Sequence, residues 1–494
     1  MARPRRSLEA EGPRPGVVHV VAEYWPFART GGLAEAARGL ANHQASHGTA
    51  CSVVLPLHRS AREVAGTLEP VGDPFIVEVG PRREVGRMWR LPGGQGPRVY
   101  FIEHPEYFDR AGLYGEGGMD YPDNHRRFAF FSRAVIAVLR QLGTPPLVVH
   151  AHDWHTSLVP VYLRTLRAGQ PFRDCVATVL SVHNAGFQGH FGFESLQDVG
   201  LPGSLFNWQQ MEWYGRVNWL KGGLVFSDMT VTVSPTHAHE LRTEAGGFGL
   251  HDTFIGLKER LVGIINGIDT AVWNPAIDDA IAARYSSEDI SGKQQCKTAL
   301  QHEFGLPEEP RTPLFGMTAR LVAQKGLDLI LGGTALTWDE AQFVFLGEGE
   351  AQYETALKRV AVRMPDHVAV ETRFSEPTEH RVIAGSDLLL MPSLYEPCGL
   401  TQLRAQHYGA VPVARRVGGL ADTIEDGVTG FLFDEYTPAS FDLAVRRAVD
   451  QYSDEDAWAL MIEDAMGRSF GWERSAARYA EVYGHALAVR RRTG

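Results

Sequence analysis

The stretch SDLLLMPSLYEPCGLTQLRAQHYGAVPVARRVGGLADT, residues 386–423, contains two apolar runs, each followed by a polar loop and a helical pattern. The first run, residues 388–391, is bounded by a proline and predicts a short buried strand. The second run, residues 411–414, leads into a turn at Gly418 and Gly419 that begins another helix. This order of strand, loop and helix, repeated twice, predicts an α/β domain with a parallel sheet.

The loop at residues 393–398 carries one carboxylate, Glu396. Pro397 stands where a helix could begin, and Gly399 permits close backbone approach. In a parallel sheet this loop lies at the carboxyl end of a strand, beside a helix amino terminus whose free N–H groups suit an anion. A carboxylate placed there must point away from any phosphate, so we expect Glu396 to contact a neutral group such as a sugar hydroxyl. The alternative interpretation is a solvated loop acid beside ordinary glycine turns.

With 494 residues, the chain is too long for one ordinary domain and fits two or three. A hydrophobic content of 44% with 22% charged residues indicates a globular protein. The net charge of -11 argues against a general binder of nucleic acid or of membrane surfaces, because no global positive field attracts phosphate groups. Any anion site must therefore be built locally.

None of the 4 cysteines stands in a C-x-x-C pair, so the sequence predicts neither a disulfide framework nor a zinc module and suits the reducing cytoplasm. No apolar run approaches the ~20 residues that a membrane-spanning helix needs. Residues 1–15 are charged, contain several prolines and lack the apolar segment of a signal peptide. We expect them to form a disordered tail.

Both halves of the chain repeat the unit of apolar strand, polar loop and helix. The predicted fold class is therefore α/β, with two doubly wound, Rossmann-like domains facing each other across a cleft. The first unit is GVVHVVAE, residues 16–23, and it is followed by YWPFARTGG rather than by the dinucleotide-binding pattern G-x-G-x-x-G. We expect domains at residues 16–260 and 261–471, a hinge at residues 246–261, and a last helix at 472–494 that could cross back to the first domain.

Apolar runs predict further strands at residues 51–55, 75–79, 99–102, 147–151, 177–182, 230–233, 261–265, 314–317, 343–346 and 368–371. Helical spacing predicts helices at residues 33–41 and 126–142, and another that includes Leu400, Leu403 and His407. Ser234 has the type and place of a helix N-cap.

Cationic side chains follow the predicted strand at residues 314–317. Arg320 and Lys325 stand in TARLVAQKG at a spacing that lets both reach one anion, and two cations can neutralise a diphosphate without a metal. Arg29, in ARTGGL, is a third candidate, and Gly31 and Gly32 would let the backbone close on a ligand. A pair of surface cations is an equally open interpretation.

His150, His152 and His155 in HAHDWHT suggest a metal site, and strand alternation puts the first two on one face. The sequence contains no second cluster with metal-ligand spacing, so we predict no metal site. Asp153, at a strand end, is expected to be a polar anchor. By chain position alone, His183 in SVHNAGFQG is expected to be a core histidine bonded to backbone.

Two aromatic segments admit two interpretations each, stacking on sugar rings or packing within an irregular loop. The first contains Tyr107, Phe108, Tyr114 and Tyr121 among glycines, and the second contains Trp213, Tyr214 and Trp219.

Taken together, the segments resemble the bacterial glycogen synthase and plant starch synthase family, the retaining glucosyltransferases of the GT-B fold (glycosyltransferase family 5). The resemblance covers nearly the whole chain, from about residue 17 to 483. It rests on motifs in the family's order: FARTGGLAE, HAHDWHTSL, SVHNAGFQG, VNWLKGGL, TVSPTHAHEL, NGIDTAVWNP, TARLVAQKGLDL, SLYEPCGLTQL and VGGLADT.

The resemblance implies a role for each predicted site residue of the second domain. Arg320 and Lys325 would bind the donor diphosphate and stabilise charge on the leaving nucleotide. Glu396 would hold the transferred glucose through its hydroxyls. The same loop would be lined by Cys398, Gly399, Leu400 and Thr401, whose backbone N–H groups at residues 399–401 would face sugar or phosphate.

In the first domain, the resemblance puts His183 beside the sugar near the reacting carbon. Asp153 would help to organise donor or acceptor, and Gly31 and Gly32 would approach the phosphates. The family pattern K-T-G-G-L-[AG]-D reads RTGGLAE here, so that Arg29 replaces a lysine and Glu35 an aspartate. Arginine keeps the charge but adds a planar fork of donors, and the longer glutamate can move its carboxylate by about 1 Å.

The implied reaction is transfer of glucose from ADP-glucose to the non-reducing end of an α-1,4-glucan such as glycogen, with retention of configuration and without a metal or other cofactor. The expected partners are the glucan and the nucleotide sugar, with no nucleic acid and no membrane, in the cytoplasm. The alternatives are a related transferase that uses UDP-glucose and a catalytically silent glucan-binding protein. A glucan phosphorylase would need a pyridoxal phosphate lysine and a much longer chain.

Overall fold

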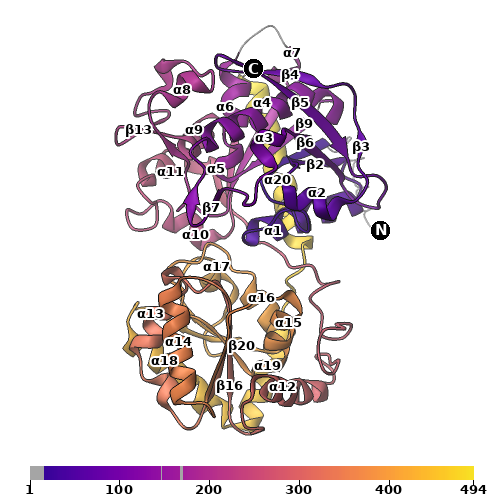
Figure 1. Cartoon of the computed structure of the whole chain (residues 1–494). Helices are drawn as coiled ribbons and strands as arrows, with labels where there is room; N and C mark the ends of the chain where they lie inside the picture. The colour runs from indigo at the N-terminus through magenta and orange to yellow at the C-terminus, as the bar shows by residue number, and fades with distance from the viewer. Residues whose placement is uncertain (1–15, 146, 167–170, 494) are drawn as a thin grey trace, which may run out of the picture. The chain divides into compact units, whose positions relative to one another are not determined.

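The computed structural model describes residues 16–145, 147–166 and 171–493; the tail predicted at residues 1–15 lies outside this range. The chain divides into two compact units (Figure 1). Unit 1 contains the described residues up to Thr232, the segment Leu241–Ile264 and the last helix, whereas unit 2 contains Val233–Glu240 and Ile265–Trp472. The chain therefore leaves unit 1 for one short segment after Thr232, leaves it again after Ile264 and returns to it after Trp472.

Unit 1 is built on a ten-stranded sheet that is parallel through its first seven strands. The strand order is β15 (Leu261–Gly263), β14 (Met229–Thr232), β10 (Val176–Val182), β9 (Leu147–His152), β1 (Gly16–Val20), β2 (Cys51–Pro56), β6 (Arg98–Glu103), β5 (Arg82–Arg90) and β3 (Glu69–Pro70), and β4 (Phe75–Val79) also pairs with β5. Strands β5, β3 and β4 are antiparallel additions at one edge. The long parallel strands are buried along their whole length, which explains their continuous apolar sequences.

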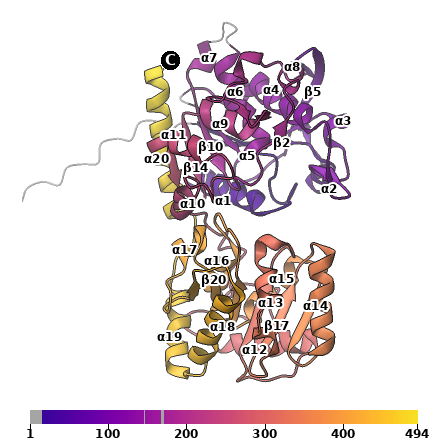
Figure 2. The ribbon, with the colours of Figure 1, turned by 90° about the vertical axis from the view of Figure 1, so that its left-hand side faces the viewer.

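The main helices of unit 1 are α1 (Gly32–Ser46), α4 (Asn124–Leu142), α6 (Leu158–Thr165), α9 (Trp219–Phe226), α11 (His251–Leu257) and α20 (Glu473–Thr493). Helix α20 packs against β9, β10, β14 and α1, and Figure 2 shows it running along one side of the unit. The shorter helices are α2 (Arg59–Ala65), α3 (Pro105–Phe108), α5 (Asp153–Thr156), α7 (Pro171–Asp174), α8 (Ser195–Asp198), η1 (Gly203–Leu205) and η2 (Lys258–Arg260). Small ribbons are formed by β7 (Gly115–Glu116) with β8 (Met119–Asp120), and by β11 (His190–Phe191), β13 (Arg216–Asn218) and β12 (Glu212–Trp213).

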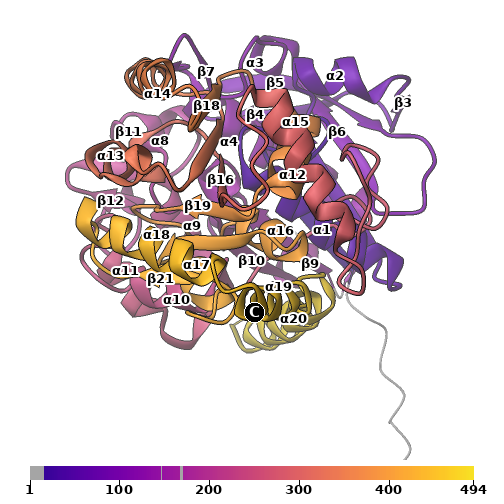
Figure 3. The same cartoon turned by 90° about the horizontal axis from the view of Figure 1, so that it is seen from below.

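Unit 2 has a six-stranded parallel sheet with the strand order β18 (Val368–Glu371), β17 (Gln342–Leu346), β16 (Leu314–Thr318), β19 (Leu388–Met391), β20 (Val411–Arg415) and β21 (Phe431–Phe433). Counted along the unit, this order is 3-2-1-4-5-6, the arrangement of a doubly wound Rossmann fold. Helices cover both faces of the sheet (Figures 1 and 3): α13 (Leu327–Gly332), α14 (Ala351–Arg363) and α18 (Pro438–Tyr452) on one side, and α12 (Ser291–Phe304), α15 (Glu376–Gly385), α16 (Thr401–His407) and α19 (Glu455–Met466) on the other. The remaining helices are α10 (Pro235–Glu240), α17 (Gly418–Thr423), η3 (Ala323–Lys325) and η4 (Ala335–Thr337).

The α/β fold class is confirmed, and so are the predicted strands, most of them to within one or two residues. The Ser234 Oγ accepts from the backbone N–H of His237 at 3.0 Å, as a helix N-cap does. Residues 246–261, predicted as a hinge, contain helix α11, which buries Phe254 and Leu257. Of the described helices, none is both long and apolar enough to cross a membrane.

Each sheet has one point at which successive connections run in opposite directions. In unit 1 the chain moves from β1 to β2 on one side, and β9 lies on the other side of β1. In unit 2 the corresponding neighbours are β16 and β19. Ligands of open α/β sheets bind at the carboxyl ends of the strands at such a switch point. The predicted site residues follow these strands or, for His183, the next strand β10.

Candidate active site

In unit 2 the structure joins the loops that follow β16 and β19 through an ion pair. Lys325 Nζ lies 2.6 Å from Glu396 Oε2, and the Ser393 hydroxyl donates to the same carboxylate oxygen at 3.0 Å. Glu396 is buried. The interpretation of Glu396 as a solvated loop acid is therefore wrong, because its charge is balanced and hydrogen-bonded inside the protein.

Backbone contacts that only glycine permits hold these loops together. At Gly326, with φ +75°, a Cβ atom would stand 2.0 Å from the carbonyl oxygen of Pro392, and at Gly418, with φ +44°, it would stand 2.0 Å from the carbonyl oxygen of Glu396. The Glu396 carbonyl also accepts from the N–H of Gly419 at 3.1 Å. Gly326 and Gly418 are thus required because their loops closely approach the backbone of the loop that follows β19.

The other predicted site residues of unit 2 stand in or directly after the same two loops as this ion pair. Arg320 is exposed, and its guanidinium has no hydrogen-bond or ion-pair partner among the residues that the structure describes. Burial raises the pKa of the Cys398 thiol to about 12, so this side chain stays protonated and is no nucleophile. Helix α16 begins at Thr401 with Leu400 as its N-cap, not at Pro397, because Gly399 first turns the chain with φ +70°.

In unit 1 the loop after β1 is organised by Glu23, a residue that the sequence analysis did not single out. Its buried carboxylate accepts hydrogen bonds from the Thr30 N–H at 2.5 Å, the Thr30 hydroxyl at 2.6 Å and the Gly31 N–H at 3.3 Å. The Tyr114 hydroxyl donates to the same carboxylate at 2.6 Å. The available signal was its position, since Glu23 is the first acid after an apolar strand that ends at the switch point.

The two positions that depart from the family pattern contact each other, with Arg29 Nη2 3.1 Å from Glu35 Oε1. Gly31 is the N-cap of α1 and Gly32 is its first residue. A Cβ at Gly31 would meet no atom within 4 Å, and its extended backbone suits any residue. No described part of the protein itself therefore requires a glycine at position 31. The space beside this backbone is open to a ligand.

Asp153 and His183 lie together at the ends of β9 and β10. Asp153 Oδ1 accepts from the backbone N–H of His183 at 2.7 Å, and Asp153 has φ +56°, a strained conformation for a residue with a side chain. Burial raises the pKa of Asp153 to about 7, although the backbone N–H groups of His183 and Asn184 oppose the shift. Asp153 is thus a carboxyl group that can change its protonation state near neutral pH.

The histidines that the structure brings together are His19, His150 and His152, whose candidate ligand atoms lie within 4.8 Å of one another. His19 was missed, although β1 pairs with β9 so that His19 stands opposite His150. Each of the six ring nitrogens of these three residues has a hydrogen-bond partner in the protein. His155 is separate and stacks on Tyr114 with ring centroids 4.3 Å apart.

Most side chains of the two aromatic segments pack inside the protein. Tyr107 and Phe108 are buried around the guanidinium of Arg127, which donates to the Tyr107 carbonyl at 2.7 Å. Trp219 is fully buried, whereas Tyr214 has 78% of its surface exposed. Of these aromatics, Tyr214 is the one with a face open to a sugar ring.

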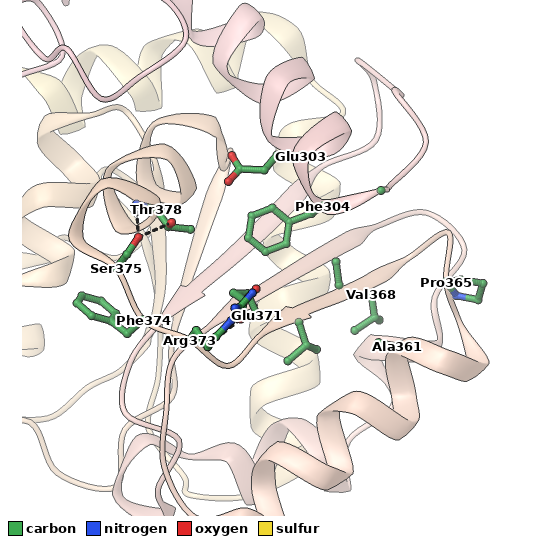
Figure 4. Close-up of a pocket in the computed structure, with 13 residues that line it drawn as sticks. Glu303, Phe304, Ala361, Pro365, Val368, Glu371, Arg373, Phe374, Ser375 and Thr378 are labelled. Atoms are coloured by element: carbon green, nitrogen blue, oxygen red, sulfur yellow. Dashed lines mark hydrogen bonds and ion pairs between the residues drawn. The ribbon is translucent and has the colours of Figure 1, made fainter.

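A cavity of about 700 Å³ opens in unit 2 beside the edge strand β18 (Figure 4). Phe304 and Val368 form apolar parts of its wall, and Glu371 and Arg373 pair with each other there. It contains none of the predicted site residues.

Two family models match the chain. A starch synthase catalytic domain matches residues 16–255, and the model named glycosyl transferases group 1 matches residues 300–460. A glycogen synthase of Anaeromyxobacter dehalogenans (strain 2CP-1 / ATCC BAA-258) is 43% identical over 94% of this chain and 98% of its own length. A glycogen synthase of Syntrophotalea carbinolica is 39% identical over 96% of this chain and 99% of its own length.

Among solved structures, the catalytic domain of Starch Synthase IV from Arabidopsis thaliana bound to ADP and acarbose superposes with a TM-score of 0.88. It is 33% identical, and the match covers 96% of this chain and 100% of that one.

Proposed function

Because this chain belongs to the family of bacterial glycogen synthases and plant starch synthases, we propose that it transfers glucose from ADP-glucose to the 4-hydroxyl at the non-reducing end of an α-1,4-glucan, with retention of configuration. Membership in this family makes the chain a glucosyltransferase with the GT-B fold, and it implies a nucleotide-sugar donor and a glucan acceptor. The identity of ADP-glucose as the donor is supported by the ADP bound to the plant relative.

The observation that carries the proposal is the pair Lys325–Glu396 at the switch point of unit 2, with Arg320 unpaired among the described residues nearby in the sequence. A donor has an anionic diphosphate next to a neutral sugar. Arg320 and Lys325 would bind the diphosphate, and Glu396 would accept hydrogen bonds from hydroxyls of the transferred glucose. The 2.6 Å contact supports this assignment, because it places the cation and the acid side by side, as the diphosphate and the sugar are side by side in the donor.

The predicted site residues of unit 1 have roles of their own in the proposal. His183 would lie beside the sugar, and Asp153, through the His183 backbone N–H, would hold that residue in place. The N–H groups at the start of α1, with Gly31 and Gly32, would approach the phosphates, since a helix amino terminus favours an anion. The open space at Gly31 supports this role.

The proposed mechanism needs no pair of catalytic carboxylates. The bond from the anomeric carbon to the diphosphate breaks as the acceptor oxygen bonds to the same face of the sugar, and the departing phosphate oxygen takes the acceptor proton. Arg320 and Lys325 would stabilise the negative charge that develops on the phosphate, and that interaction strengthens in the transition state. The two cations supply the neutralisation that a metal would otherwise give, so the proposal includes no metal or other cofactor.

A cytoplasmic location is part of the same proposal. It is supported by the four cysteines, all of which are free thiols.

A donor comparison tests the proposal directly. The purified full-length chain is incubated with glycogen and either ADP-glucose or UDP-glucose, and released nucleotide and incorporated glucose are both measured. We expect faster transfer from ADP-glucose, with unchanged turnover after treatment with EDTA. Faster transfer from UDP-glucose would overturn the donor assignment, a loss of turnover in EDTA would overturn the metal-free mechanism, and glycogen binding without nucleotide release would favour a silent glucan-binding protein.

A further inference from the structure

Seven side chains of unit 1 form one continuous hydrogen-bonded chain in its interior. From one end, His183 Nε2 lies 3.0 Å from His152 Nδ1, His152 Nε2 lies 3.1 Å from His19 Nδ1, and His19 Nε2 lies 2.9 Å from Gln44 Oε1. Gln44 Nε2 then donates to the Tyr483 hydroxyl at 3.1 Å. The chain continues through His150, whose ring nitrogens lie 2.9 Å from the Tyr483 hydroxyl and 2.7 Å from Ser181 Oγ.

The four imidazoles of this chain are neutral at physiological pH. Burial lowers the pKa of His19 and of His183 to about 4, and it lowers the pKa of His150 and His152 well below the usual value. A neutral imidazole has one N–H donor and one acceptor nitrogen. His19 and His152 must therefore each donate on one side and accept on the other, so that the direction of one hydrogen bond decides the tautomers of His19, His152 and His183.

Gln44 is the residue that can decide this direction, because its amide has a donor end and an acceptor end. Its Oε1 faces His19 and also lies 3.9 Å from the Sγ of Cys51. Burial raises the pKa of the Cys51 thiol to about 12, so the thiol keeps its proton and can donate. Turning the amide round would put an NH₂ group beside the thiol of Cys51, whereas with Oε1 on this side the thiol has an acceptor and the NH₂ group donates to Tyr483.

We propose that Gln44, acting through His19 and His152, holds His183 in the tautomer with the proton on Nε2, so that Nδ1 of His183 is presented as a hydrogen-bond acceptor. With Gln44 Oε1 as acceptor, the proton of His19 is on Nε2, the proton of His152 is on Nε2, and that of His183 follows. Nδ1 of His183 has no partner among the described residues. Its use for a sugar hydroxyl rests on the function proposed above, and Gln44 is a positioning residue for it.

The chain also makes the last helix part of the site's support. Tyr483 lies on α20, which packs on β10 (Figure 2), and its hydroxyl accepts from Gln44 and lies 2.9 Å from Nδ1 of His150. Tyr483 thus accepts from the NH₂ end of the Gln44 amide, while the oxygen end of the same amide faces His19. Gln44 and Tyr483 are 439 positions apart in the chain, which explains why no sequence pattern indicates this contact.

The test combines imidazole nitrogen NMR of the histidine-labelled full-length enzyme with steady-state kinetics. The His183 signals are assigned by their loss in His183→Gln. In the wild-type enzyme without substrate we expect a proton on Nε2 and none on Nδ1. Gln44→Leu removes the acceptor that faces His19, so it should mix the tautomers of His183 and lower kcat by ~10-fold with little change in KM.

The matched control is Asn42→Leu, which removes a partly buried amide of α1 outside the chain and should leave the His183 signals and kcat unchanged. A proton on Nδ1 of His183 in the wild-type enzyme would overturn the inference without any variant. Equal kcat and identical spectra for Gln44→Leu and wild type would also overturn it. Failure of the proposed function would look different, because the expected spectrum would then accompany an enzyme that transfers no glucose.

Discussion

Glu396 is held by side chains from two loops, Lys325 after β16 and Ser393 after β19. Its carboxylate is therefore part of a small buried network and not an isolated acid. This changes the way in which its role can be tested, because removing the whole side chain would leave Lys325 without its partner. A replacement that keeps the shape of the side chain separates chemistry from stability.

We predict that Glu396→Gln lowers kcat by ~10²-fold, because the amide loses the charge that strengthens hydrogen bonds to the sugar in the transition state. The fold should persist, since the amide still accepts from Ser393. Glu396→Ala should be as inactive and should also lose ~1–3 kcal/mol of stability by leaving Lys325 unpaired. Turnover with ADP-glucose and urea unfolding measure the two effects.

The matched control is Glu371→Gln, a change in an acid that ends the edge strand β18 and pairs with the exposed Arg373. It should leave both turnover and stability unchanged. Near-normal turnover of Glu396→Gln would show that Glu396 does not contact the reacting sugar.

At the scale of elements, the site depends on loops whose backbones touch. Gly326 ends η3 and precedes α13, and it lies against the carbonyl of Pro392 at the end of β19. Lys325, its neighbour, reaches Glu396 in the loop that begins there. The spacing of β16 and β19 thus sets the cation and the acid in contact only while position 326 has no side chain.

We predict that Gly326→Ala lowers both stability and turnover, whereas Gly305→Ala lowers stability alone. Both glycines have left-handed backbones, with φ +75° and +71°, so each alanine costs ~1–2 kcal/mol from its conformation. At Gly326 the new Cβ would also stand 2.0 Å from the Pro392 oxygen, but at Gly305 it would meet nothing within 4 Å. Thermal unfolding and kcat for the two variants give the comparison, and equal kcat values would contradict the proposed coupling of the loops.

At the scale of the whole molecule, the stability of unit 1 is linked to pH through a group of histidines. In unit 1, burial lowers the pKa of His19, His58, His150, His152, His155 and His183. Unfolding exposes them, and their pKa then returns to about 6.5. Between pH 6.5 and about 4 the unfolded chain therefore binds more protons than the folded one.

We predict that the stability of unit 1 is constant above about pH 7 and falls as the pH drops from 6.5 toward 4. Asp153, whose pKa is raised to about 7, has the opposite effect, but it is one group against six. Urea unfolding at several pH values, followed by tryptophan fluorescence, measures the slope. His155→Phe keeps the ring that stacks on Tyr114 and should reduce the slope by about one proton, whereas the exposed His302→Gln should not change it. A stability that does not change between pH 7 and pH 5 would show that these histidines are not buried in the neutral form.

The amino-acid sequence by itself determined the strands, the α/β class and the family. Apolar runs bounded by proline, glycine and polar loops are local patterns, so residues 388–391 could be recognised as a strand without knowledge of their neighbours. Glu396 and Lys325 could be named as candidates because they follow such strands.

Only the tertiary structure decided which of these residues meet. Lys325 and Glu396 are 71 residues apart, and their contact depends on β19 lying next to β16 in the sheet. The same holds for Glu23 with Tyr114 and for the row from His183 to Tyr483, because hydrogen bonds between distant segments leave no periodic trace in the sequence. Local chemistry therefore indicated where the site residues stand, and the order of the strands determined their partners.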